Sequence, residues 1–208
     1  MGILNNSGNS LPSSIAFENP INESQNTFRH ILKAMSEPGV IRNPESKLSV
    51  PSPLYLATAA VGLTLLDFQT QVWVDIPHDH DVIKYLKFHT GMKLTENPYE
   101  ADFALVFSIP RQLDSFNLGS DSYPDASATL IIQTKTISTN GNLILTGPGI
   151  KSSRNLGLPE IPSAFWSQRV ELQKLFPRGL DLIFTTNHKL VAIPRTTIIK
   201  QLKTNMAR

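Results

Sequence analysis

The sequence predicts an α/β fold, a three-layer arrangement with a mixed sheet covered by helices on both faces. Helix-like and strand-like segments alternate along most of the 208 residues. The strand-like segments are nearly continuous in apolar residues, which is typical of strands covered on both faces. Two of them, residues 182–186 and 190–193, flank Asn187-His188 and predict a β-hairpin in which Asn187 takes a positive φ. Pro194 would end the second strand, because proline has no N–H to donate.

The N-terminal part of the chain predicts an arm and then a helix. Residues 1–20 are rich in Asn and Ser and show no apolar period, so we expect a mobile arm, followed by a single domain over residues 21–208. The next apolar residues recur at helical spacing and predict an amphipathic helix. Its apolar stripe consists of Phe28, Ile31, Leu32 and Met35. Pro38 and Gly39 would end the helix in a turn.

The middle of the chain continues the alternation. Residues 54–66 are apolar on all sides and predict a buried helix that starts at Ser52-Pro53. After it we expect a strand at 71–76, a short helix around 82–86 capped by Asp79 or Asp81, and a strand at 103–107. Residues 109–126 predict a loop with one helical turn.

A second hairpin is predicted further along, with Asn140-Gly141 as its turn between strands at 130–137 and 143–146. Gly147-Pro148-Gly149 would then redirect the chain. Ser163 would cap a helix that leads into the last hairpin. The glycines at 147 and 149 also invite comparison with phosphate-binding loops, but a third glycine and a following lysine are missing, so a structural turn is favoured.

Six segments of this sequence resemble the PhnH family, whose members are subunits of the bacterial carbon-phosphorus lyase system. They are FRHILKAMSEPGVI (28–41), FHTGMKL (88–94), ATLIIQ (128–133), LTGPGI (145–150), FPRGLDLIF (176–184) and AIPRTT (192–197). The resemblance covers about residues 25–197. It implies a fold like that of the pyridoxal-phosphate-dependent transferases without their cofactor site, because no position matches a catalytic lysine.

The resemblance also implies a function. The chain would be a non-catalytic subunit of the carbon-phosphorus lyase core complex, needed to form α-D-ribose 1-methylphosphonate 5-triphosphate from ATP and methylphosphonate. Its partners would be PhnG, PhnI, PhnJ, PhnK and PhnL, and it would form a homodimer. No catalytic residue, metal or cofactor of its own is expected.

Composition supports a cytoplasmic protein that binds neither membranes nor nucleic acid. The sequence has no cysteine, which excludes disulfides, thiolate metal sites and a self-held iron-sulfur cluster. The net charge is only +2, and the basic C-terminal region lacks interleaved aromatic residues, which argues against nucleic-acid binding. No signal peptide is evident, and the apolar run at 54–66 is shorter than the roughly 20 residues of a membrane span.

Arg195, Thr196 and Thr197 follow the last predicted strand and form the first candidate site. A guanidinium and two hydroxyls match the oxygens of a phosphate or phosphonate, but a subunit contact or a salt bridge is an equal alternative. Glu37, in the predicted turn, and His89, near a helix C-terminus, are secondary candidates. The alternative function is therefore a free-standing phosphate- or phosphonate-binding enzyme that uses Arg195 and His89.

The sequence His78-Asp79-His80-Asp81 is the one dense cluster of metal-type ligands. Alternate side chains of an extended segment could converge on a cation. The cluster precedes a predicted helix, however, where a capping aspartate is common. The cap is favoured, and no metal site is predicted.

Overall fold

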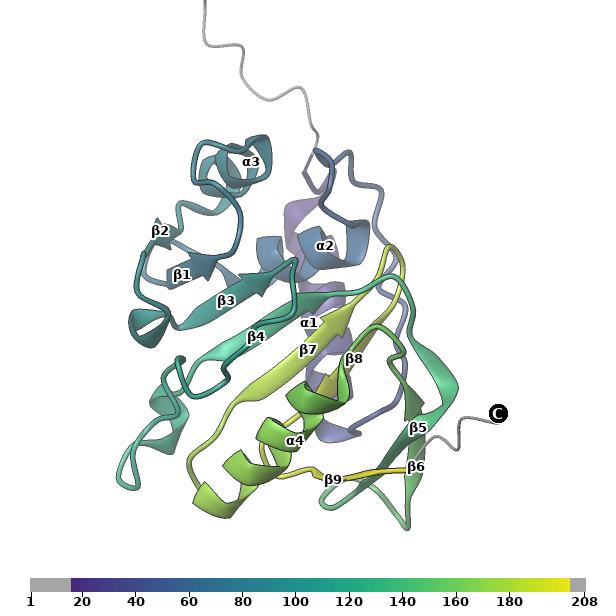
Figure 1. Cartoon of the computed structure of the whole chain (residues 1–208). Coiled ribbons are helices and arrows are strands. Elements are labelled where there is room, and N and C mark those ends of the chain that lie inside the picture. The colour runs from purple at the N-terminus through teal and green to yellow at the C-terminus, as the bar shows by residue number, and fades with distance from the viewer. Residues whose placement is uncertain (1–15, 203–208) are drawn as a thin grey trace, which may run out of the picture.

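The computed structural model describes residues 16–202, which form two β-sheets flanked by helices (Figure 1). The larger sheet has the strand order β2-β1-β3-β4-β7-β8, and the smaller one β6-β5-β9. All neighbours in the larger sheet are parallel except β7 and β8. Its strands are β1 (Gln71–Val74), β2 (Lys93–Leu94), β3 (Phe103–Val106), β4 (Thr129–Gln133), β7 (Asp181–Thr185) and β8 (Leu190–Ile193). The predicted α/β class with a mixed sheet is confirmed.

Helices and the small sheet make the two outer layers. The helices are α1 (Pro20–Ser36), α2 (Leu56–Leu65), α3 (Asp81–Thr90) and α4 (Ser163–Leu172), with short 3-10 helices η1 (Pro98–Glu100), η2 (Pro124–Ala126) and η3 (Gln173–Leu175). The small sheet contains β5 (Ser138–Thr146), β6 (Arg154–Gly157) and β9 (Ile198–Gln201). In Figure 1, α4 lies in front of the large sheet and α1 behind it. The layer behind holds α1, α2 and α3, and the layer in front holds α4 and the small sheet.

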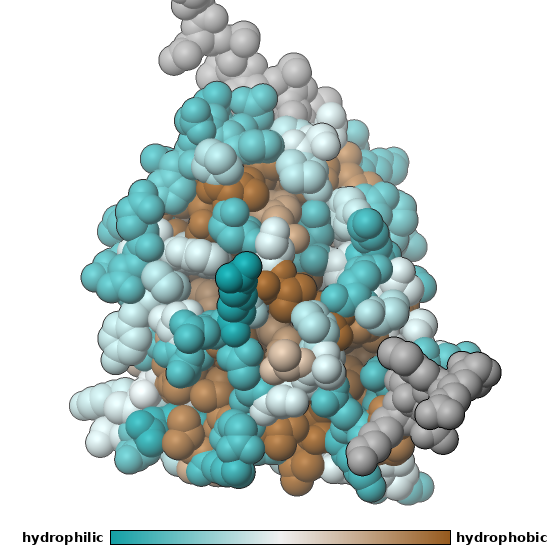
Figure 2. All heavy atoms as spheres, viewed as in Figure 1, coloured by the Kyte–Doolittle hydropathy of each residue, from teal (hydrophilic) through white to brown (hydrophobic). Residues whose placement is uncertain are grey.

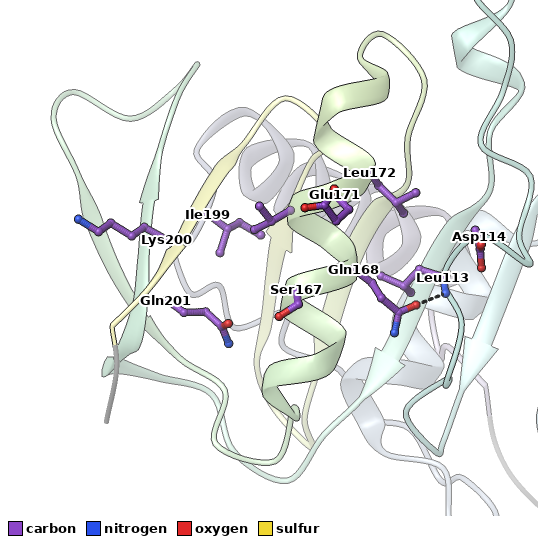
Figure 3. Close-up of a pocket in the computed structure, with 10 residues that line it drawn as sticks. Leu113, Asp114, Ser167, Gln168, Glu171, Leu172, Ile199, Lys200 and Gln201 are labelled. Atoms are coloured by element: carbon purple, nitrogen blue, oxygen red, sulfur yellow. Dashed lines mark hydrogen bonds between the residues drawn. The ribbon is translucent and has the colours of Figure 1, made fainter. Parts of the chain in front are cut away.

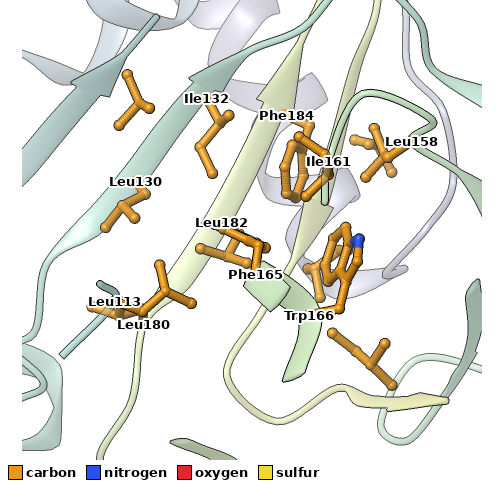
Figure 4. Close-up of a cluster of buried hydrophobic side chains, with 14 of the residues drawn as sticks. Leu113, Leu130, Ile132, Leu158, Ile161, Phe165, Trp166, Leu180, Leu182 and Phe184 are labelled. Atoms are coloured by element: carbon orange, nitrogen blue, oxygen red, sulfur yellow. The ribbon is translucent and has the colours of Figure 1, made fainter. Parts of the chain in front are cut away.

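Each face of the large sheet has its own hydrophobic core, which explains the continuous apolar runs. Alternate residues of a strand point to opposite faces, so both faces of β7 are apolar. Leu182 and Phe184 belong to the front core, whereas Ile183 belongs to the back core. Phe165 and Trp166 of α4 pack over Phe184, with ring centroids 6.3 and 5.6 Å away (Figure 4).

The predicted last hairpin is present, but its turn differs. β7 and β8 pair antiparallel, with Thr185 opposite Leu190. No residue other than glycine has a positive φ between residues 16 and 202, so the expected φ of Asn187 is wrong. The loop is instead closed by Thr186, whose N–H donates to the Lys189 carbonyl at 2.8 Å and whose Oγ1 accepts from the Lys189 N–H at 3.0 Å.

The predicted hairpin at Asn140-Gly141 is wrong. β4 ends at Gln133 in the large sheet, whereas β5 runs through Asn140 and Gly141 without turning. The pairing of β5 with β6 is irregular between Ser138 and Leu143. A Cβ on Gly141 would lie 2.1 Å from the Gly157 Cα, so this glycine permits a close approach of two backbones rather than a turn.

Three helix starts also differ from the expectation. Ser163 is the first residue of α4 and does not cap it, because the N-cap position is Pro162 and no side chain caps this helix. α2 begins at Leu56, three residues after Pro53, because Asn187 of the hairpin loop caps it: Asn187 Oδ1 accepts from the Leu56 N–H at 3.2 Å and its carbonyl from the Ala57 N–H at 3.1 Å. α3 is capped by His80, whose Nδ1 accepts from the Val82 N–H at 3.2 Å, and not by an aspartate. A histidine nitrogen can accept as a carboxylate does, and the sequence pattern does not separate the two.

The predicted apolar stripe of α1 is only partly buried. Ile31 is buried, but Phe28 and Leu32 are 44% and 51% exposed. The helix buries Thr27 and Ala34 instead. The face that carries Phe28 and Leu32 is therefore open to solvent in the isolated chain.

The N-terminal segment and residues 109–126 were predicted to have little regular structure. The expected arm at residues 1–20 lies largely outside the described residues, but Phe17 is buried at 9% exposure. Residues 109–126 form the predicted loop, with η2 as its one helical turn. No helix within residues 16–202 is both long and apolar enough to cross a membrane.

Gly149, in the loop between β5 and β6, packs directly against the end of α1. It has a φ of +78°, and a Cβ there would lie 2.1 Å from the Ser36 carbonyl oxygen. Gly62 inside α2 differs, because its Cβ would meet only Leu86 and Leu66 side chains, at 3.5 and 3.7 Å.

We therefore expect Gly149→Ala to lower the free energy of unfolding by at least about 2 kcal/mol, through backbone strain and collision with Ser36. Gly62→Ala is the matched control and should be neutral or stabilising by up to about 1 kcal/mol, since alanine favours the helix. Urea denaturation of both variants measures this. Equal effects of the two substitutions would contradict the packing described.

Candidate functional site

Several segments far apart in the sequence meet where the chain passes between the two sheets. Gly39 donates its N–H to the Ala192 carbonyl at 3.1 Å, and Arg154 of β6 donates to the Pro38 carbonyl. A Cβ on Gly147 would lie 3.0 Å from the Thr196 carbonyl oxygen. We call this contact region of residues 36–39, 147–149 and 192–197 the glycine junction. The Gly147-Pro148-Gly149 turn is thus a packing element, as predicted.

Arg195, the first candidate, is paired within the chain. Its backbone N–H and Nε donate to Asp181 Oδ1 at 2.8 and 3.3 Å, and Nη2 donates to Oδ2 at 2.6 Å. Nη1 donates to the Pro124 carbonyl. Both charged side chains are 15% exposed. This guanidinium therefore fixes the start of β7, the end of β8 and η2 to one another.

A second arginine lies deeper beside this pair. Arg169 of α4 is 1% exposed and donates from Nη2 to the Pro194 carbonyl at 2.9 Å, while its Nε has no partner among the described residues. Burial lowers the pKa of Arg169 to about 10, with Asp181 opposing and Arg195 adding to the shift. Arg169, Arg195 and Asp181 together carry one more positive than negative charge.

Thr196 and Thr197 complete the passage from β8 to β9. Thr197 is buried, and its N–H donates to the Pro194 carbonyl at 2.9 Å, which closes a turn. Its carbonyl accepts from Gln173 Nε2 at 3.1 Å, and its Oγ1 lacks a partner in residues 16–202. Thr196 is half-buried beside Gly147. The three predicted residues therefore act here as one structural unit.

The structure separates the two secondary candidates. Glu37 is half-buried at the glycine junction and forms an ion pair with Arg42. His89 is exposed at the end of α3, with its ring against Tyr85 and Phe88 at centroid distances of 4.8 and 4.9 Å. In Figure 1, α3 and β9 lie at opposite ends of the molecule. Arg195, next to β9, and His89 are not brought together.

The usual ligand-binding edge of such a sheet, beyond the carboxyl ends of its parallel strands, holds a crevice of about 300 Å³. Two of its polar side chains, Gln133 and Glu160, hydrogen-bond within the chain. Gln133 accepts from the Tyr55 N–H at 2.8 Å and donates to the Pro53 carbonyl at 2.8 Å. Glu160 accepts from Thr134 Oγ1 and from the Lys135 N–H. Lys135 lines this crevice with an exposed side chain.

Asp75, which sequence reasoning did not single out, closes the same edge between β1 and β3. Its carboxylate accepts from the Phe107 N–H at 2.8 Å and from the Ser108 N–H at 2.5 Å. Burial raises the pKa of Asp75 above its usual value, although these hydrogen bonds oppose the shift. The only signal in the sequence is an aspartate at the end of an apolar strand.

The His78–Asp81 cluster does not assemble a metal site. His80 caps α3, and His78 pairs with Glu96 at 3.1 Å. No group of three metal-ligating side chains occurs in the part of the chain that the structure describes.

Sequence comparison with known proteins shows the family of this chain. The sequence profile of the family described as bacterial phosphonate metabolism protein (PhnH) matches residues 15–200. The chain belongs to the PhnH family. It is 33% identical over 190 residues to the α-D-ribose 1-methylphosphonate 5-triphosphate synthase subunit PhnH of Rhizobium meliloti (strain 1021), which covers 89% of this chain and 94% of that protein.

A second relative is HtxG of Stutzerimonas stutzeri, provisionally named a C-P lyase subunit protein. It is 38% identical over 82 residues, 39% of this chain and 42% of HtxG. The PhnH profile extends from before α1 into β9, so the family region contains both sheets and the glycine junction. The resemblance deduced from the short segments is confirmed.

We expect Arg195→Ala to lower the free energy of unfolding by about 3 kcal/mol, because it leaves a largely buried Asp181 carboxylate without its cation. Arg29→Ala, which removes an exposed arginine of α1, should change it by less than about 0.5 kcal/mol. Chemical denaturation compares the two. A similar, small effect of both would show that the ion pair is not structural.

We expect the carboxyl of Asp75 to make the stability of the fold depend on pH. The pKa of Asp75 is raised in the folded chain, so ionisation of this carboxyl opposes folding. As the pH rises through the carboxyl range, around pH 4, the wild type should therefore lose stability relative to Asp75→Asn. Asparagine keeps one oxygen for the Phe107 and Ser108 N–H groups. Thermal melts of both proteins across this range measure the difference, which would be constant with pH if burial did not act on this carboxyl.

Proposed function

We propose that this chain is a non-catalytic subunit of the carbon-phosphorus lyase core complex, needed to form α-D-ribose 1-methylphosphonate 5-triphosphate from ATP and methylphosphonate. The observation that carries the proposal is the 33% identity to a named synthase subunit over 94% of that protein's length. The match spans both sheets rather than an isolated motif, which supports a shared role as well as a shared fold.

The chemistry of the candidate sites supports a structural role. Arg195 is held by Asp181, and Gln133 and Glu160 at the carboxyl edge are held by backbone groups of the chain. A catalytic group must reach the substrate with a free lone pair, proton or charge. In these side chains, the lone pairs, protons and charges already take part in contacts that hold the fold together.

We extend the proposal to the assembly. The chain would bind PhnG, PhnI, PhnJ, PhnK and PhnL, form a homodimer, and act in the cytoplasm as one domain over residues 21–208. The exposed apolar side chains of α1 support partner binding, since Ile21, Phe28 and Leu32 are 80%, 44% and 51% exposed. The single antiparallel strand at the edge of a parallel sheet supports a fold like the pyridoxal-phosphate-dependent transferases.

The purified chain alone should neither consume ATP nor release adenine in the presence of methylphosphonate, because Arg195, Gln133 and Glu160 are hydrogen-bonded within the fold. When the chain is mixed with the partner subunits, adenine should be released, which chromatography of the nucleotides and bases measures. Turnover by the isolated chain, at a rate that scales with its concentration, would overturn the non-catalytic role.

A free-standing phosphate- or phosphonate-binding enzyme using Arg195 and His89 is the alternative. The excess positive charge of Arg169, Arg195 and Asp181 is the one observation that favours it. In that case the isolated wild-type chain would bind methylphosphonate in calorimetry, and Arg195→Ala would abolish binding while Arg29→Ala would not. Under the subunit proposal the isolated wild type gives no binding signal.

A further inference from the structure

The groove between α4 and β9 in the front layer is partly closed by contacts within the chain. It has a volume of about 600 Å³, and Ile199 on its strand wall is only 5% exposed. Figure 3 shows Gln168 of α4 bound to Leu113, whose N–H donates to Gln168 Oε1 at 2.9 Å. On this front face, Figure 2 shows apolar residues among hydrophilic ones. A regular stripe of exposed apolar side chains lies instead on α1, in the back layer.

Three apolar side chains on one side of α1 are open to solvent. Ile21, Phe28 and Leu32 are 80%, 44% and 51% exposed. With Gln25, they follow the spacing of four, three and four residues that forms the seam between two packed helices. We call these four residues the α1 stripe. Another side of the helix packs on the back core, so α1 has one side for its own chain and a second side free for another helix.

The charges of α1 are separated by sign along the helix axis. The acidic residues Glu18 and Glu23 lie just before the helix and in its first turn, whereas the basic residues Arg29 and Lys33 lie in its second half. None of the four forms an ion pair with another residue within 16–202. The two ends of the helix therefore present opposite charges to whatever binds the α1 stripe.

We infer that the α1 stripe is the contact surface for a second copy of this chain, whose α1 packs against it in the antiparallel direction. The inference rests on the proposed function, since that includes a homodimer. A two-fold axis midway between Gln25 and Phe28 sets Ile21 of each copy opposite Leu32 of the other, because both lie equally far from this point. It also brings Glu18 of each copy to the last turn of the other helix, where Lys33 lies.

A second copy fits this surface because the stripe and the charges are complementary to themselves under a two-fold rotation. Apolar side chains meet apolar side chains, and the acidic end of each helix meets the basic end of the other. The two helix macrodipoles also oppose each other in this arrangement, which is favourable. A parallel arrangement would instead bring like charges together at both ends. The surface therefore needs no complementary sequence from a different chain.

The apolar part of the contact is tested with Phe28→Asp, which places a charge in the middle of the α1 stripe. Phe88→Asp is the matched control, because Phe88 of α3 is 58% exposed and lies outside the stripe. Dissociation constants are measured by analytical ultracentrifugation over a range of protein concentrations. Phe28→Asp should weaken self-association at least about tenfold, whereas Phe88→Asp should associate like the wild type.

The charged part of the contact is tested with Glu18→Lys and Lys33→Glu, two exposed positions at which the fold tolerates substitution. Each single variant turns both symmetric contacts between residues 18 and 33 into like-charge pairs, and should weaken self-association several-fold at low salt. The variant that carries both substitutions has opposite charges across the interface again and should associate like the wild type. An equimolar mixture of the two single variants should do the same by forming mixed dimers.

The outcomes separate this inference from the proposed function. If the wild type self-associates, but neither Phe28→Asp nor the charge reversals weaken association, the α1 stripe is not the contact and the homodimer stands. If the wild type stays monomeric at every concentration, the inference and the homodimer are wrong, while the subunit role is judged separately by adenine release with the other subunits. If Phe28→Asp abolishes capture by the other subunits but leaves self-association unchanged, the stripe binds a different chain and the inference is overturned.

Discussion

The ion pair of Arg195 with Asp181 determines where the chain leaves the large sheet. Asp181 begins β7 and Arg195 follows β8, so the pair closes the hairpin at the amino end of β7. The adjoining turn, from the Pro194 carbonyl to the Thr197 N–H, then sends the chain into β9 of the small sheet. The direction of β9, its pairing with β5 and the placement of the front layer all follow from this corner, which is why an arginine with three donor groups suits it better than a lysine.

The sequence predicted elements well where local and long-range forces agree. The last hairpin is present because each strand is apolar enough to be buried on both faces and the loop between them is short. The Asn140-Gly141 hairpin failed because the same glycine meets a different need, the approach of Gly157, and a backbone contact between residues 141 and 157 leaves no local pattern. A glycine marks freedom of the backbone, and only the tertiary structure shows how that freedom is used.

The candidate site was predictable in part for the same reason. The unusual Arg-Thr-Thr end of the hairpin stood out, but its partner Asp181 lies at the start of the neighbouring strand, and nothing in the spacing indicates the pairing. The apolar stripe of α1 was predicted as one face of an amphipathic helix, but two of its members, Phe28 and Leu32, are exposed. Apolar periodicity identifies a face that avoids water and does not tell whether the covering atoms belong to the same chain.

The carboxyl edge of the large sheet uses several of its polar side chains in contacts within the fold. At the carboxyl edge of the large sheet, Asp75 binds the backbone after β3, Gln133 binds the chain before α2, and Asn187 caps that helix. Lys135, which lines the crevice at the same edge, is exposed. Side chains whose types and positions suggest a ligand site therefore serve here to hold strands, loop and helix together, and only the tertiary structure shows which polar groups remain exposed.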